Sequence, residues 1–193
     1  MAANAVTRNA VMPLPPATGR KLKHTRSVNI EIYSREDELW DIDARLVDTK
    51  THDVKLTIGK LPANQPIHDL WLRLIVDRHA NIVDVETAMD SVPFTGYCDV
   101  IAPAYKKLIG LNVLKGFRQG VRERFSETDG CSHLNELSII LPTAAIQVFA
   151  FEKRHESAGQ PQEQKPFELD HCHALRCDGP AVAVFYPRWA NSK

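Results

Sequence analysis

Alternating apolar and polar residues predict β-strands in the first half of the chain. In residues 26–34, Val28 and Ile30 alternate with polar residues, which indicates a half-buried strand. Residues 39–49 separate into two faces with a period of two. The apolar face of that second segment should point to the core and consists of Trp40, Ile42, Ala44 and Leu46.

Three further segments continue the pattern. Residues 52–58 alternate again and end at Gly59, so the first three segments are most simply three antiparallel strands joined by short turns. After a proline-containing loop, residues 69–77 and 82–90 are expected to form a hairpin. Its first strand has an apolar side made of Leu70, Leu72, Leu74 and Val76.

The period becomes helical after Cys98. Apolar residues at helical spacing predict one helix that ends at Gly110 and a short, arginine-rich one over residues 116–125. A longer helix should begin near Cys131, with a kink at Pro142. Its expected buried face comprises Leu134, Leu137, Ile140, Leu141, Ala145 and Val148.

These elements predict an α+β fold, an antiparallel sheet with helices packed on one face. We expect a disordered arm over residues 1–22, one α+β domain over 23–152 and a linker over 153–167. Residues 168–193 should form a C-terminal flap with a final apolar strand, packing on the same domain. A chain of 193 residues can bury a sizeable core as a single domain.

The composition of the chain limits the classes of binding partner and the cell compartment that we expect. The 24 basic and 24 acidic residues balance, so charge gives no case for nucleic acid or an anionic membrane. No continuous apolar run approaches the length of a membrane span. The first 24 residues lack the apolar segment of an export signal, which favours the cytoplasm. There the four cysteines should remain thiols.

Cysteine and histidine residues at element boundaries suggest a metal site, because thiolates, imidazoles and carboxylates are the usual ligands of zinc and iron. Cys131 and His133 stand where a helix is expected to start, and Cys98 stands before an earlier helix. His68 and Asp69 stand at the start of a strand. Secondary candidates are Cys172 and His173 in the C-terminal flap.

Each candidate also has a structural interpretation. Cys98 could be a small buried core residue, and His68 with Asp69 could cap a turn. Cys177 could be a thiol without a role. The arginines of residues 116–125 could bind a small anionic molecule or form a solvated helix face. The sequence contains no phosphate-binding glycine loop and no nucleophile motif, so catalytic residues stay unassigned.

Six stretches within residues 12–190 carry a family resemblance: HTR, LWDIDARLVDTK, PIHDLWLRLIVD, GCSHLNEL, CHALRCDGPAV and YPRW. They resemble an uncharacterised bacterial family, domain of unknown function 2889. The family description implies no activity.

Residues 66–150 also resemble the iron–sulfur cluster scaffold of the NifU/IscU type, in the order strand, turn, strand, cysteine, helix, cysteine. The resemblance implies a SufE/NifU-like core in which Cys98 and Cys131 stand for two ligand cysteines. His68 and Asp69 would stand where the scaffold has its first cysteine and an aspartate. A histidine replaces that cysteine, and the segment read by the scaffold's chaperone is absent. These departures favour one metal ion over a cluster.

Three functions follow from these observations. The first is a protein that binds zinc or iron through Cys98, Cys131, His133, Asp69 and His68. The second is a metalloenzyme acting on a small molecule, such as an aromatic compound, through an open metal position. The third is a metal-free interaction module. The sequence leaves open both enzymatic activity and a homodimer.

Overall fold

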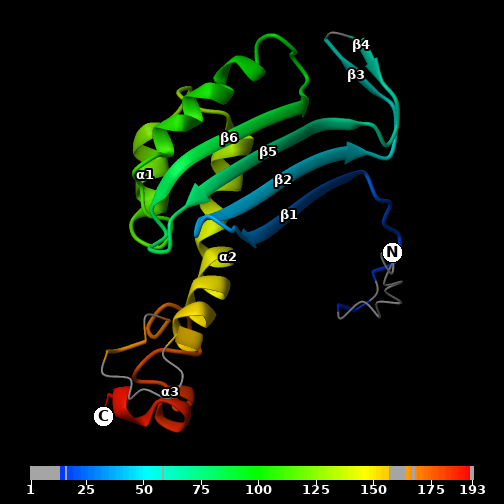
Figure 1. Cartoon of the computed structure of the whole chain (residues 1–193). Helices are drawn as coiled ribbons and strands as arrows, with labels where there is room; N and C mark the ends of the chain where they lie inside the picture. Colours follow the sequence, from blue (N-terminus) through cyan, green and yellow to red (C-terminus); the bar gives the residue numbers. More distant parts are fainter. Residues whose placement is uncertain (1–13, 16, 58, 157–163, 167, 192–193) are drawn as a thin grey trace, which may run out of the picture.

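The protein is described by a computed structural model that covers residues 14–191 except 16, 58, 157–163 and 167. Most of the predicted arm and of the predicted linker therefore lies outside the described residues. The described elements form a curved sheet, helices against it and a small C-terminal unit (Figure 1).

Four antiparallel strands form the sheet in the order β1-β2-β5-β6. Their bounds are β1 His24–Ser34, β2 Trp40–Lys50, β5 Pro66–Val76 and β6 Ile82–Ser91. The four long predicted strands are thus confirmed. The β5–β6 connection is tight, because the side chain of Asp77 accepts hydrogen bonds from the backbone N–H groups of His79 and Asn81.

The prediction that residues 52–58 add a third strand to this sheet is wrong. They contribute β3 (Val54–Leu56), which pairs with β4 (Gly59–Leu61) in a separate two-stranded sheet. Gly59 has a φ of 143°, a conformation that side chains rarely permit, and the chain reverses there. The segment therefore pairs with its own continuation.

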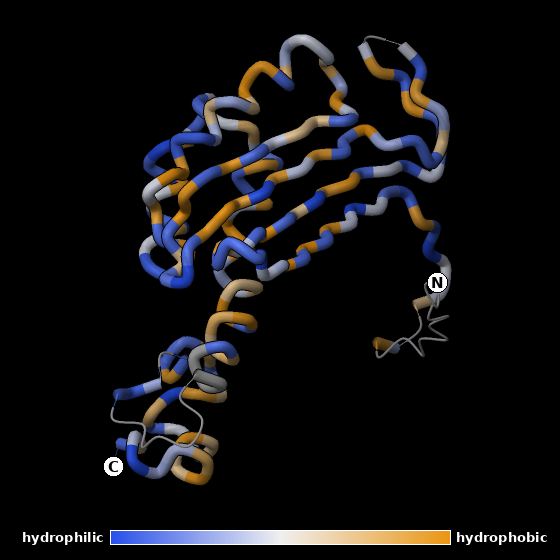
Figure 2. Tube along the Cα trace, in the orientation of Figure 1, coloured by the Kyte–Doolittle hydropathy of each residue, from blue (hydrophilic) through white to orange (hydrophobic). Residues whose placement is uncertain are grey.

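One face of the main sheet is buried. The predicted apolar positions of β2 and β5 point to that face, and the tube in Figure 2 shows the alternation along the strands. The buried apolar residues that these two strands place on this face are Ile42, Ala44, Leu46, Leu70, Leu72, Leu74 and Val76. Trp40 is partly buried and packs against them.

Helices cover this face, as predicted. The long helix α2 (Ser132–Glu156) contacts β1, β2 and β5. The helix η1 (Asp99–Leu108) contacts β6, and α1 (Phe117–Arg124) contacts both helices. η1 is a 3-10 helix rather than an α-helix. It contains Pro103, which has no N–H to donate to an α-helical hydrogen bond.

The buried stripe of α2 differs from the prediction in two places. Leu134, Leu137, Leu141 and Ala145 are buried as predicted. Ile140 is exposed, and Phe149 rather than Val148 continues the stripe. Steps of three and four residues from Leu141 reach Leu134, Leu137, Ala145 and Phe149, so the neighbouring Ile140 turns away from the sheet. Pro142 lies inside the helix.

The predicted final apolar strand is a helix. α3 (Pro180–Phe185) begins just after Gly179, and η2 (Pro187–Trp189) follows it. Proline at the first helical position is favourable because its missing N–H has no helical partner there. This C-terminal segment has an apolar cluster of its own, built on Leu169, Cys177 and Val182.

One helical stretch, Ser132–Glu152 within α2, is long and apolar enough to cross a membrane by length and composition. The stretch is not a continuous apolar run in the sequence, because a few polar residues interrupt it. In the structure 44% of this window is buried inside the protein. Core helices that pack on a sheet pass the same test, so α2 is weak evidence for a membrane.

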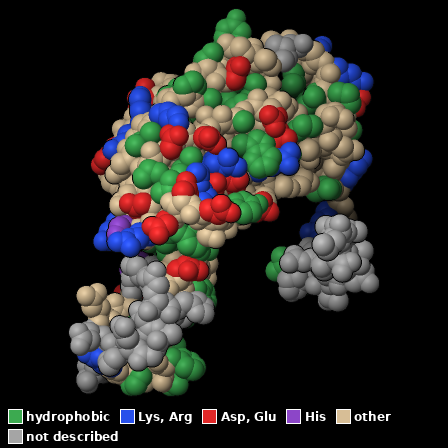
Figure 3. Space-filling view, in the orientation of Figure 1, with side chains coloured by type: hydrophobic (Ala, Val, Ile, Leu, Met, Phe, Trp, Pro, Cys, Tyr) green, Lys and Arg blue, Asp and Glu red, His purple; other side chains and the backbone are tan. Residues whose placement is uncertain are grey.

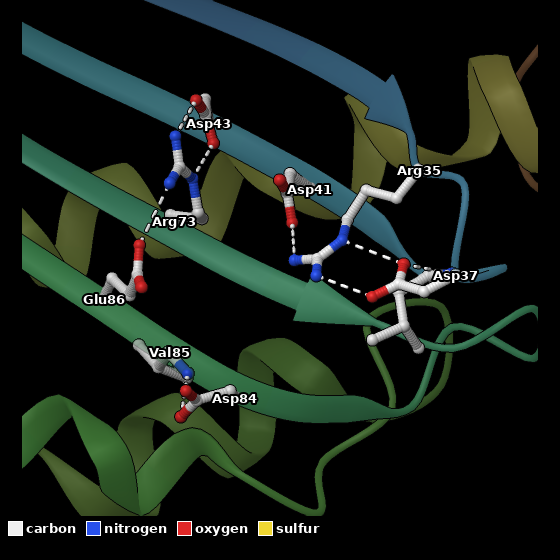
Figure 4. A network of polar contacts seen from close by, with 9 residues as sticks. Arg35, Asp37, Asp41, Asp43, Arg73, Asp84, Val85 and Glu86 are labelled. Atoms are coloured by element: carbon white, nitrogen blue, oxygen red, sulfur yellow. Dashed lines mark hydrogen bonds and ion pairs between the residues drawn. The ribbon is translucent and has the colours of Figure 1, made fainter.

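None of the helices in the described part of the chain lies on the other face of the sheet (Figure 1). Acidic and basic side chains alternate across this open face (Figure 3). Arg73 on β5 bridges Asp43 on β2 and Glu86 on β6, and Arg35 pairs with both Asp37 and Asp41. Figure 4 shows Asp43, Arg73 and Glu86 lying across three strands, and Arg35 with Asp37 and Asp41 where β1 leads into β2.

Candidate metal centre

A row of polar side chains crosses three strands at one end of the helix-covered face. Arg26 on β1 stands opposite Asp48 on β2, and Asp48 stands opposite His68 on β5. Paired residues in antiparallel strands point to the same face. Each of the three continues the apolar series of its strand, two positions beyond the last apolar residue. Asp48 is therefore buried, with 2% of its surface exposed.

The strand pairing is irregular at this row. The register of β2 with β5 shifts between Asp48 and Thr49, so that Thr49 stands opposite Pro66. β-bulges of this kind redirect side chains and are frequent next to functional sites.

Helix α2 brings His133 to the row from the opposite layer. The start of this helix is fixed by the hydroxyl of Tyr105, which donates to Oδ1 of Asn135 (2.6 Å) and accepts from the N–H of Cys131 (3.1 Å). A Cβ on Gly130 would lie 2.7 Å from Cβ of Phe125, so only glycine fits this turn. The backbone at Gly130 therefore packs closely against Phe125 and Asn135.

His68, His133 and Asp48 together form a group that could hold a metal ion. One ligand atom from each residue lies within 4.8 Å of the other two. Nδ1 of His68 lies 3.1 Å and Nε2 of His133 lies 3.7 Å from Oδ2 of Asp48. Metal bonds of about 2.1 Å place neighbouring ligand atoms about 3.0–3.4 Å apart in octahedral or tetrahedral geometry. The spacing therefore fits a metal with small adjustments.

The two carboxylate oxygens of Asp48 face different partners. Oδ1 accepts from Nε of Arg26 (2.9 Å) and lies 3.1 Å from Nε2 of His24. Oδ2 faces both His68 and His133 and also accepts from Nη2 of Arg26 (2.8 Å). One oxygen is therefore held in place, and the other is directed at the two imidazoles.

The electrostatic environment favours the forms that bind metal. Burial acts to raise the pKa of Asp48, but the hydrogen bonds and charge of Arg26, with His68 and His24, hold this pKa below its ordinary value. Burial lowers the pKa of His68, and His133 lowers it further against the opposing effect of Asp48. Burial and then the charge of Arg26 lower the pKa of His133. Metals bind carboxylate and neutral imidazole.

The imidazoles lie close to each other and remain accessible. The ring centroids of His68 and His133 are 3.9 Å apart, with the planes tilted by 35°. Their side chains keep 18% and 23% of their surfaces exposed, against 3% for Asp48. Solvent or a small molecule can therefore reach the histidines while the carboxylate stays shielded.

Two of the residues predicted from the sequence, His68 and His133, thus meet. They meet at Asp48, which is not among the predicted ligands. The period-two pattern contained a signal for it, because Asp48 follows Leu46 on the apolar face. Asp69 points to the open face, since successive strand residues alternate. There it forms two hydrogen bonds with Arg45, at 2.8 and 2.6 Å.

The cysteines lie elsewhere. Within the part of the chain that the structure describes, the metal-competent group contains no cysteine. Cys98 lies at the start of η1, and the partly buried Cys131 packs against the core. Cys172 and His173 are exposed in the C-terminal segment, where His173 contacts Arg176. Ligation by these residues stays a prediction from the sequence.

Two of the α1 arginines hold helices together. Arg118 donates to the carbonyl of Ile139 and to Thr143 on α2. Arg124 donates to the carbonyl of Lys107 on η1. Two of the arginines in this arginine-rich segment therefore have a structural role, because they join α1 to neighbouring helices.

Comparisons with known proteins give a match to one family model. Neither the curated proteins nor the solved structures give a match, so the scaffold resemblance of residues 66–150 gains no support from them. A family model matches residues 24–147, a range that includes Asp48, His68 and His133. The chain belongs to this family, which is described as a protein of unknown function (DUF2889).

Proposed function

We propose that this protein binds one divalent transition metal ion, zinc or iron(II), through Asp48, His68 and His133. The observation that carries the proposal is the convergence of three ligand atoms within 4.8 Å of one another, from β2, β5 and α2. Two imidazoles and one carboxylate suit both metals. Neither cysteine expected from the scaffold resemblance is needed for this set.

The surroundings of the group support a metal in preference to a simple ion-pair network. His24 and Arg26 hold Oδ1 of Asp48, while Oδ2, which also accepts from Nη2 of Arg26, is directed at the histidines. Outer hydrogen bonds of this kind orient a ligating carboxylate and raise metal affinity. A metal ion on Oδ2 would displace only the hydrogen bond from Nη2 of Arg26. The hydrogen bond from Nε of Arg26 is made to Oδ1 and can remain.

Calorimetric titration of metal-free protein with Zn²⁺, and with Fe²⁺ without oxygen, tests the proposal. We expect one ion per chain. His68→Ala and His133→Ala should each weaken metal binding by about 100-fold or more. Substituting a residue that only hydrogen-bonds to a metal ligand already lowers metal affinity by about 10–100-fold. His173→Ala, at an exposed position in the C-terminal segment, is the matched control and should bind normally. No binding by a folded wild-type protein, or equal binding by all variants, would refute the proposal.

The number of ligands supports a second candidate, a metalloenzyme acting on a small molecule. Three protein ligands leave at least one metal position for water or substrate, as in catalytic zinc and non-haem iron sites. The exposed fractions of His68 and His133 allow access. Water-proton relaxation of the Mn²⁺-loaded protein tests for this position, and the absence of exchangeable water on the metal would exclude this candidate.

A further inference from the structure

We infer that Arg26 makes this centre a site for a small oxyanion, a carboxylate or a phosphate-type group, bound jointly by the metal and the guanidinium. This inference rests on the proposed metal site. Its basis is the position of Arg26, which contacts the metal-facing oxygen of Asp48 through Nη2 at 2.8 Å.

Arg26 forms hydrogen bonds with two carboxylates rather than with one. It donates from Nε and Nη2 to Asp48 and from Nη1 to Glu136 at 2.5 Å. A metal ion bound to Oδ2 of Asp48 would neutralise the negative charge that Nη2 of Arg26 now faces. Nη2 would then lie beside the metal without its carboxylate oxygen, while Nε and Nη1 keep the guanidinium in place.

An anion on the metal would satisfy both groups at once. Charge-assisted hydrogen bonds from arginine to carboxylate or phosphate oxygens are short and strong, and the planar guanidinium matches their geometry. The Arg26 side chain is 33% exposed, so an anion can reach it from solvent.

The surrounding charge is also suitable for a small anion. His133 is the second residue of α2, and the first turn of that helix carries no acidic side chain. The unpaired N–H groups of a helix start favour negative charge. Glu136 also lies nearby, and its side chain is 60% exposed and pairs with Nη1 of Arg26. The negative charge of Glu136 therefore competes with an anion for Arg26.

The open face of the sheet provides a matched control. Arg45 forms the same two-bond pair with the buried Asp69 as Arg26 does with Asp48. No histidine belongs to that pair, and Asp69 is not in the metal-competent group. Replacing either arginine removes an equivalent contact from a buried carboxylate, but only Arg26 is beside the metal site.

The test is titration of the Co²⁺-loaded protein with formate and, separately, with methylphosphonate, followed by the visible absorption of Co²⁺. We expect a saturable spectral change with at least one of the two anions, and the stronger response identifies the anion class. Arg26→Met should weaken anion binding about tenfold or more, the usual value of a charge-assisted hydrogen bond. Arg45→Met should leave it unchanged.

A gain-of-affinity variant guards against a misfolded Arg26→Met protein. Glu136→Gln removes the exposed competing carboxylate and should strengthen anion binding severalfold. Co²⁺ binding without an anion response in wild type and Glu136→Gln would overturn the inference and leave the metal proposal intact. Failure of the folded wild-type protein to bind Co²⁺ would instead refute the metal proposal on which the inference rests.

Discussion

Nδ1 of His68 lies 3.1 Å from Oδ2 of Asp48, across the β2–β5 strand pair and at the point where the register of that pair shifts. The contact joins an imidazole that is 18% exposed to a carboxylate that is almost completely buried. With His133 above it on α2, this pair makes one end of the covered face chemically distinct from the leucine-rich remainder.

Metal should stabilise the fold. A ligand that binds only the folded state at a free concentration of 100 times its Kd adds about 2.7 kcal/mol. We therefore expect Zn²⁺ to raise the melting temperature of the wild-type protein and chelation to reverse the rise. His133→Ala should abolish the shift and His173→Ala should retain it. An equal Zn²⁺ shift in His133→Ala would show that the metal binds elsewhere.

Stability should fall on mild acidification because of the two histidines. The pKa values of His68 and His133 are lowered from the ordinary 6.5, with burial as the largest cause. Below that value the unfolded chain binds more protons than the folded one, so stability present near neutral pH is lost as the pH falls through this window.

Urea unfolding at pH 7.5 and 5.5, without metal, measures the acid effect. The double variant His68→Gln, His133→Gln should lose less free energy of unfolding between the two pH values than the wild type does. Asp48 contributes nothing to this difference, since its lowered pKa keeps it ionised at both. The same loss in the double variant would contradict the expected role of the histidines.

The Tyr105 hydroxyl should matter for both stability and metal binding. Tyr105→Phe leaves Oδ1 of Asn135 and the N–H of Cys131 without their partner, which should cost about 1–3 kcal/mol. The start of α2 would loosen, so metal affinity should fall as well. Chemical unfolding and metal titration measure the two effects.

Tyr33→Phe is the matched control for that change. The Tyr33 hydroxyl binds Glu31 in an exposed position, so its loss should alter stability by no more than about 0.5 kcal/mol. Equal effects of the two substitutions would mean that Tyr105 does not fix the beginning of α2.

Replacing the two cysteines predicted as ligands should preserve the metal. Cys98→Ser and Cys131→Ser together leave Asp48, His68 and His133 intact, so elemental analysis should find the same metal content as in the wild type. A drop in metal content in the folded double variant would restore the cysteine ligation that the sequence suggests.

Local patterns predicted most of the sheet correctly, because one-sided burial imposes a period of two on each strand. The register between strands could not be predicted in the same way. Asp48 meets His68 through pairing of segments 20 residues apart, and the shift of register beside Asp48 leaves no mark in either segment alone. The errors have local causes, such as the reversal at Gly59 and the helix start at Pro180.

The site was predicted in part for the same reason. His68 and His133 attracted attention as metal-ligand types at the ends of elements. Asp48 and Arg26 looked like ordinary surface charges of strands, although each stands on the apolar face of its strand. A polar residue that continues an apolar series is the signal that would have identified both.

X-ray absorption spectroscopy of the zinc-loaded protein tests the central claim most directly, because it separates nitrogen and oxygen ligands from sulfur by distance. We expect ligand atoms at about 2.0–2.2 Å, with the outer scattering of two imidazoles and no contribution at the zinc–sulfur distance of about 2.3 Å. That spectrum should be lost in His68→Ala. A sulfur contribution, or a spectrum unchanged by His68→Ala, would contradict a metal centre built from Asp48, His68 and His133.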